Sequence, residues 1–117
     1  MGRRPATDAE ATLTPLMFQI LVALSAGPRH GYAVLQEIEE RTGGAFPVGA
    51  GSMYRALRQL LEAGLVQETE PAGRAHAQRR TYRLTASGRA RAASAARVLH
   101  DMVSWAREAR LLDPARR

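Results

Sequence analysis

The hydrophobic pattern of the chain changes its period twice, and this succession limits the possible folds more than any other feature. Three segments with helical spacing lie within residues 13–63, and two short strand-like segments follow at 65–70 and 79–84. One long helical segment then occupies residues 85–112. Because apolar residues recur about every 3.6 positions in a helix and every second position in a strand, this order predicts a mainly helical fold with one β-hairpin.

Capping residues and helix breakers mark the ends of the first three helices. Thr14 before Pro15 predicts the start of the first helix, and Gly27-Pro28 predicts its end. A second helix is predicted at 31–42 and a third at 52–63, with a brief extended segment at 46–48 between them. The residues expected in the core share one face of each helix: Leu16, Ile20, Ala23 and Leu24; Val34, Leu35 and Ile38; Met53, Leu57, Leu60 and Leu61.

The second and third predicted helices, followed at once by the hairpin, have the outline of a winged helix-turn-helix. The fold class is therefore α+β, mainly α with a small β-hairpin wing. We expect a flexible arm at 1–12, a winged-helix domain at 13–84, a dimerisation helix at 85–112 that begins after Thr85, and a tail at 113–117.

An apolar stripe runs along the long C-terminal helix at steps of three and four residues, and a domain of this size cannot wholly cover it. The alternatives are packing on the chain's own core and packing on a second copy; the length of the helix favours a homodimer. The predicted interface combines this stripe with the first helix: Leu16, Ile20, Ala92, Ala96, Leu99, Met102, Val103 and Ala106. Trp105, with Leu99 and Met102, is a candidate lining of an effector pocket, although an aromatic filling the dimer seam is the favoured interpretation.

Positive charge is concentrated in the middle of the chain. The formal net charge is +6, and every basic residue is arginine. Residues 51–91 hold eight arginines against three acids, whereas residues 1–50 hold four against five. A concentrated basic region predicts a polyanionic partner such as nucleic acid.

The third predicted helix and the hairpin tip carry the candidate DNA contacts. A polar helix face is often merely solvated, but the adjacent basic hairpin favours groove reading, because arginine and glutamine pair with base edges and wing charges hold phosphates. The predicted DNA-binding residues of the helix are Ser52, Tyr54, Arg55, Arg58 and Gln59, and those of the wing are Arg74, His76, Arg79 and Arg80. The hairpin tip as a soluble loop remains an alternative.

An ordered set of short motifs over about residues 13–90 resembles the PadR family of transcriptional regulators. The motifs are Leu13-Thr14-Pro15-Leu16, Gly27-Pro28, His30-Gly31-Tyr32, Gly51-Ser52-Met53-Tyr54, Gly64-Leu65-Val66 and Arg80-Thr81-Tyr82-Arg83-Leu84-Thr85. The resemblance implies homodimerisation through the terminal helix and repression relieved by a small effector or stress signal. It also places Tyr32 at the start of the helix before the recognition helix, among the DNA-binding residues. The rings of Tyr32 and Tyr54 are expected to be buried, with only the hydroxyl groups reaching water or phosphate.

Catalysis and metal binding are not expected. The chain lacks cysteine and lysine, and its three histidines share no metal-ligand spacing, so we expect neither an enzyme nor a cofactor. No secretory signal or membrane span is visible, which predicts a cytoplasmic protein. Two alternatives to a sequence-specific regulator remain: a structural nucleic-acid binder without base reading, and a winged-helix module that serves protein assembly or effector sensing alone.

Overall fold

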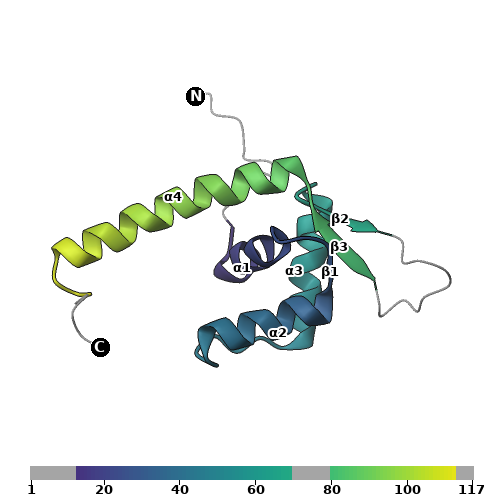
Figure 1. The fold of residues 1–117 in the computed structure, drawn as a ribbon, viewed down its shortest axis with the longest axis horizontal. Helices are drawn as coiled ribbons and strands as arrows, with labels where there is room; N and C mark the ends of the chain where they lie inside the picture. Colours follow the sequence, from purple (N-terminus) through teal and green to yellow (C-terminus); the bar gives the residue numbers. More distant parts are fainter. Residues whose placement is uncertain (1–12, 70–79, 113–117) are drawn as a thin grey trace, which may run out of the picture.

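The structure is a computed structural model that describes residues 13–69 and 80–112 (Figure 1). Its elements follow the predicted order of helices, hairpin and long helix. They are α1 (Pro15–Leu24), β1 (Arg29–His30), α2 (Gly31–Thr42), α3 (Ala50–Glu62), β2 (Val66–Thr69), β3 (Thr81–Leu84) and α4 (Ala86–Glu108). The four helices and the small antiparallel sheet form the α+β winged helix that the sequence predicted.

The sheet has three strands in the order β1-β3-β2, so β3 lies in the centre. Val66 pairs with Leu84 on one side of β3, and Arg29 pairs with Tyr82 on the other. The strand β1 was not predicted, because two residues are too few to show an alternating pattern. No strand forms at 46–48, the segment that the sequence predicts to be briefly extended.

The core lies where α1, α2 and α3 meet the sheet. Its fully buried members include Ile20, Leu24, Val34, Met53 and Leu57, in agreement with the predicted helix faces. Ile20 has 0% of its surface exposed, so the prediction that it contributes to a dimer interface is wrong. The stripe of α1 that the sequence shows is used inside the subunit, because α1 packs against both α2 and α3.

The start of α4 is fixed to the winged helix by several contacts at one point. The Thr85 backbone N–H donates to the Leu65 carbonyl at 3.1 Å, and the Thr85 hydroxyl donates to the Gly64 carbonyl at 2.8 Å while accepting the Gly88 N–H at 2.9 Å. Gly88 is buried against Leu65 and Leu84. These hydrogen bonds and the close packing at Gly88 join the first turn of α4 to the segment between α3 and β2.

Beyond this junction α4 extends past the rest of the subunit (Figure 1). It ends at Glu108, before the predicted end near residue 112. Arg110 adopts a left-handed backbone with φ 65°, and the Leu111 N–H donates to the Ala106 carbonyl at 2.9 Å. This is a Schellman ending, which usually has glycine at the left-handed position. An arginine there gave the sequence no stop signal.

Candidate nucleic-acid interface

The exposed face of α3 carries the predicted base-reading residues. Met53, Ala56, Leu57 and Leu60 hold the opposite face in the core. At about 100° per residue, Arg55, Arg58 and Glu62 follow one line through the middle of the exposed face. Ser52 and Gln59 lie along one edge of this face, and Tyr54 lies along the other. The helix thus presents two guanidinium groups, an amide, two hydroxyl groups and a carboxylate side by side.

A glycine allows α2 and α3 to approach closely beside this face. A Cβ on Gly31 would lie 2.9 Å from both Cε1 and the hydroxyl oxygen of Tyr54, so the Tyr54 ring rests on a backbone that has no side chain. Tyr32, in the first turn of α2, is 62% exposed. The expectation that the Tyr32 ring is buried is therefore wrong, whereas Tyr54 is held partly covered over Gly31. The expected place of Tyr32 at the start of α2 is confirmed.

The four helices differ in how their N-terminal amides are satisfied. Thr14 caps α1 and Thr85 caps α4, each accepting a backbone N–H through its hydroxyl group. Gly49 before α3 offers no side-chain cap, and His30 before α2 makes none. Uncapped first-turn amides are suited to hold an anion such as a phosphate. The two uncapped helices are the two that form the helix-turn-helix.

The arginines of the site differ in whether an acid already neutralises them. Within residues 13–69 and 80–112, Arg55 and Arg58 make no ion pair. Arg80, predicted as a wing contact, instead pairs across the sheet with Glu68. Glu68 therefore partly neutralises the charge of Arg80, which makes Arg80 a weaker candidate for a phosphate contact.

Arg83 is an exposed residue of the wing that the sequence prediction omitted. It projects from β3 on the face opposite the buried Tyr82, and its guanidinium donates to Gln67 Oε1 at 3.1 Å and 3.3 Å. The alternation of Tyr82 and Leu84 inward with Arg83 outward was the signal that identifies it.

Comparison with known proteins agrees with this geometry. The sequence model of the PadR-like family of transcriptional regulators matches residues 20–94, well over half of the chain. The chain belongs to the PadR-like family. That family is described as one of transcriptional regulators.

Two solved structures and one curated relative illustrate the similarity. A PadR family transcription regulator of Clostridium difficile R20291 aligns with a TM-score of 0.72 at 19% identity, over 81% of this chain and 97% of that one, which supports the fold. RosR of H. salinarum, in a complex structure, aligns with a TM-score of 0.61 at 27% identity, over 92% of this chain and 100% of that one. An uncharacterized 37.1 kDa protein in transposon Tn4556 of Streptomyces fradiae is 41% identical over 70 residues, or 60% of this chain. This chain spans about a fifth of that relative's length, because the match covers 19% of it.

In this PadR-like chain a two-sided ion pair orients α2. Glu37 accepts from Arg29 of β1 through one carboxylate oxygen and from Arg41 through the other at 2.7 Å. Hydrogen bonds from Arg29 and then Arg41 hold the pKa of the Glu37 carboxyl below its ordinary value. Arg29 also lies 3.4 Å from the Ala23 carbonyl at the end of α1. The network therefore fixes α1, β1 and α2 relative to one another.

The remaining predicted residues of the PadR-like chain fall into three groups. Arg74, His76 and Arg79 lie outside the described residues. Leu16 and Ala92 pack partly on the subunit's own core. Leu99, Met102, Val103 and Trp105 are exposed along α4, as is Ala96, whereas Ala106 on the same helix is half-buried.

Residues 13–69 and 80–112 contain no cluster of potential metal ligands. None of the helices in those ranges combines the length and apolarity that a membrane span needs.

Proposed function

We propose that the chain is a homodimeric, sequence-specific repressor that reads duplex DNA with α3. The observation that carries this proposal is the pair Arg55 and Arg58 in the middle of the exposed face of α3. Both are exposed, and neither has an ion-pair partner in the described residues. An arginine without an acid partner can place its guanidinium on a guanine edge or a phosphate without breaking an existing contact. Ser52 and Gln59 then lie beside it to read neighbouring positions.

Phosphate contacts around this helix position it in the groove. The Tyr54 ring lies against Gly31 at the uncapped start of α2. The uncapped amides of α2 and α3 and the hydroxyl groups of Tyr32 and Tyr54 are proposed to hold phosphates. Arg83 is exposed on the hairpin that follows α3. We propose that Arg83, Arg74, His76 and Arg79 contact phosphates from this wing. Such contacts supply affinity and register, whereas α3 supplies sequence discrimination.

The proposal of a homodimer rests on the uncovered apolar face of α4. Leu99 is 41% exposed, and Met102 and Val103 lie beside it on a helix that leaves the subunit body. Large apolar side chains in a row on a soluble helix favour burial against a partner. A twofold dimer through α4 would present two copies of α3 to successive major grooves, about 34–36 Å apart.

Relief of repression is proposed to come from a small effector in the space between subunits, in the cytoplasm. Leu99 and Met102 are proposed to line that space. Trp105 follows Leu99 by six residues and so lies about 120° around the helix from it. Leu99 and Met102 can therefore line one small pocket more readily than all three predicted residues together can.

A duplex-binding assay with matched arginine variants tests the proposal. We expect the protein to bind DNA from upstream of its own coding region more tightly than a scrambled duplex at every salt concentration. If each arginine contacts a base, Arg55→Ala and Arg58→Ala should each weaken binding to the upstream duplex by about 1–3 kcal/mol. Each variant should also reduce the ratio of affinities for the upstream and scrambled duplexes. Arg97→Ala, which removes an exposed arginine on the polar side of α4, is the control and should leave the preference unchanged.

The same assay separates the proposal from its alternatives. Equal affinity for all duplexes and for RNA would indicate a structural nucleic-acid binder. Affinity that the double variant of Arg55 and Arg58 leaves unchanged would indicate a winged helix used for assembly or effector sensing alone.

A further inference from the structure

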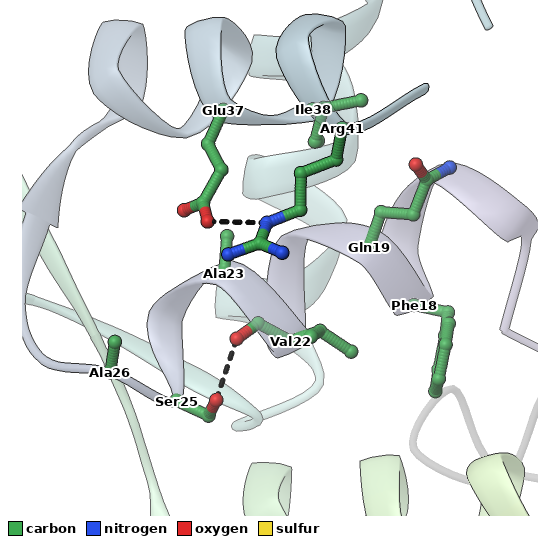
Figure 2. A pocket seen from close by; sticks show the side chains of 9 residues that line it. All are labelled: Phe18, Gln19, Val22, Ala23, Ser25, Ala26, Glu37, Ile38 and Arg41. Atoms are coloured by element: carbon green, nitrogen blue, oxygen red, sulfur yellow. Dashed lines mark hydrogen bonds and ion pairs between the residues drawn. The ribbon is translucent and has the colours of Figure 1, made fainter. Parts of the chain in front are cut away.

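A hollow of about 370 Å³ opens on the surface between α1 and α2 (Figure 2). Phe18, Val22 and Ala23 of α1 and Ile38 of α2 form its apolar wall. Val22 is 48% exposed, so a single subunit leaves this aliphatic side chain largely in water. The volume lies at the lower end of pockets that accept drug-sized molecules, about 300–1,000 Å³, and therefore admits a large aromatic side chain.

Two charged side chains, Glu37 and Arg41, border this hollow. Figure 2 shows Arg41 extending from α2 toward α1, with its guanidinium beside the Glu37 carboxylate. The Arg41 side chain is 77% exposed. Because Arg29 also pairs with Glu37, Arg41 can turn toward a second acid while Glu37 keeps a partner.

The apolar surface of α4 is wider than one partner helix can cover. Val98 and Trp105 are seven residues apart and form a second line, about 100–120° around the helix from Leu99. Trp105 is 73% exposed, so its subunit leaves most of the large apolar ring in water. A partner that covers the first stripe with its own α4 therefore leaves the second line for another of its elements.

Acidic residues flank the tryptophan on this second line. Asp101 precedes Trp105 by four residues and Glu108 follows it by three, so both lie on the same side of the helix as the ring. Both residues are exposed. An indole between two carboxylates is complementary to an apolar hollow bordered by an arginine.

We propose that Trp105 of one subunit enters the hollow between α1 and α2 of a second copy, with Asp101 and Glu108 facing the partner's Arg41. The ring would pack on the partner's Phe18 and Val22, and the partner's Arg41 would cover its face as a cation–π contact. This inference rests on the proposed dimer. The ring does not occupy the hollow of its own subunit, because Trp105 is 73% exposed and is not among the residues that line that hollow.

The contact connects the dimer to the DNA-reading helix. α2 packs on α3 within each subunit, so an indole held between α1 and α2 is one layer away from the recognition helix of the partner. Twofold symmetry gives two such contacts in each dimer. The position of each head is then set by the α4 of the other subunit as well as by its own.

Fluorescence of the dimer tests the proposal, because Trp105 is the only tryptophan in the 117-residue sequence. We expect blue-shifted emission that resists quenching by acrylamide. Val22→Glu should shift the emission to the red, raise the quenching constant severalfold and raise the dimer dissociation constant. Ala93→Glu introduces the same charge at an exposed position on the polar side of α4 and should change none of these.

Subunit mixing shows whether the ring uses the partner's hollow. Val22→Glu subunits are mixed with an excess of Trp105→Phe subunits, so the one indole of each mixed dimer faces an intact hollow. Return of the blue-shifted emission supports the proposal, and emission that stays red overturns it.

Two further outcomes separate this inference from the proposed function. A dimer with the same emission in the wild type and Val22→Glu overturns the tryptophan contact alone, and leaves the hollow to a small apolar ligand. A protein that sediments as a monomer at micromolar concentration overturns both the contact and the proposed dimer.

Discussion

Replacing Gly88 with alanine tests the packing that joins α4 to the winged helix. A Cβ on Gly88 would lie 2.8 Å from Cδ1 of Leu84 and 3.0 Å from the carbonyl carbon of Leu65, and the Leu65 carbonyl oxygen would be closer still. Backbone atoms cannot turn aside as a flexible side chain can. Either the Leu65 peptide or the first turn of α4 must therefore move.

Two effects of opposite sign decide the size of the change. Alanine favours a helix over glycine by about 0.8–1 kcal/mol, which alone would stabilise the protein. Overpacking against backbone costs about 1–3 kcal/mol, and displacement of the Leu65 carbonyl also weakens its hydrogen bond with the Thr85 N–H, worth about 0.5–1.5 kcal/mol. The costs exceed the gain, so we expect a net loss of about 1–3 kcal/mol in the free energy of unfolding.

Urea unfolding at a fixed protein concentration measures this loss, because the stability of a dimer depends on concentration. Gly51→Ala is the matched control: it lies in α3 and a Cβ there has no neighbour within 4 Å. We expect the urea midpoint to rise or stay constant for Gly51→Ala and to fall for Gly88→Ala. A midpoint for Gly88→Ala equal to or above that of the wild type would refute the reasoning.

Three further predictions concern single contacts. Glu37→Gln should lower the free energy of unfolding at neutral pH. Because the pKa of Glu37 in the folded protein is below its ordinary value, the extra stability of the wild type should be complete above that ordinary value and should disappear as the pH falls through the folded pKa. Urea midpoints of both proteins measured across this pH range test the prediction. Thr85→Ala removes the cap of α4 and should cost about 0.5–2 kcal/mol by thermal or urea unfolding, and no loss would contradict the cap. Gly31→Ala should push the Tyr54 ring away and weaken duplex binding in a gel-shift titration, with a smaller stability loss than Gly88→Ala because a side chain can move; unchanged affinity would remove Tyr54 from the interface.

Local sequence signals were sufficient to predict helices whose ends are marked by capping or helix-breaking residues. The bounds of α2 were predicted correctly because Gly43 takes the left-handed conformation after its last turn, at φ 60°. The buried faces followed from spacing. The end of α4 was missed because Arg110 occupies a left-handed position where sequence rules expect glycine.

Contacts between distant segments could not be predicted from single positions. Strand β1 exists only because β3 offers it a neighbour, and the pairing of Arg80 with Glu68 depends on the register of the hairpin. Ile20 was assigned to the dimer interface because an apolar stripe does not show whether the same subunit or a second copy covers it. The hollow between α1 and α2 had no sequence signal, since its walls come from two helices whose crossing the sequence does not specify.

Footprinting on duplex DNA tests the central claim most directly, because it reports both heads of the dimer and their dependence on sequence. The protein is bound to DNA from upstream of its coding region and cleaved with hydroxyl radicals. We predict two protected segments related by a dyad and centred one helical turn apart, about 10–10.5 base pairs, both lost in the double variant of Arg55 and Arg58. A single protected segment, or even protection along any duplex whatever its sequence, would contradict the claim.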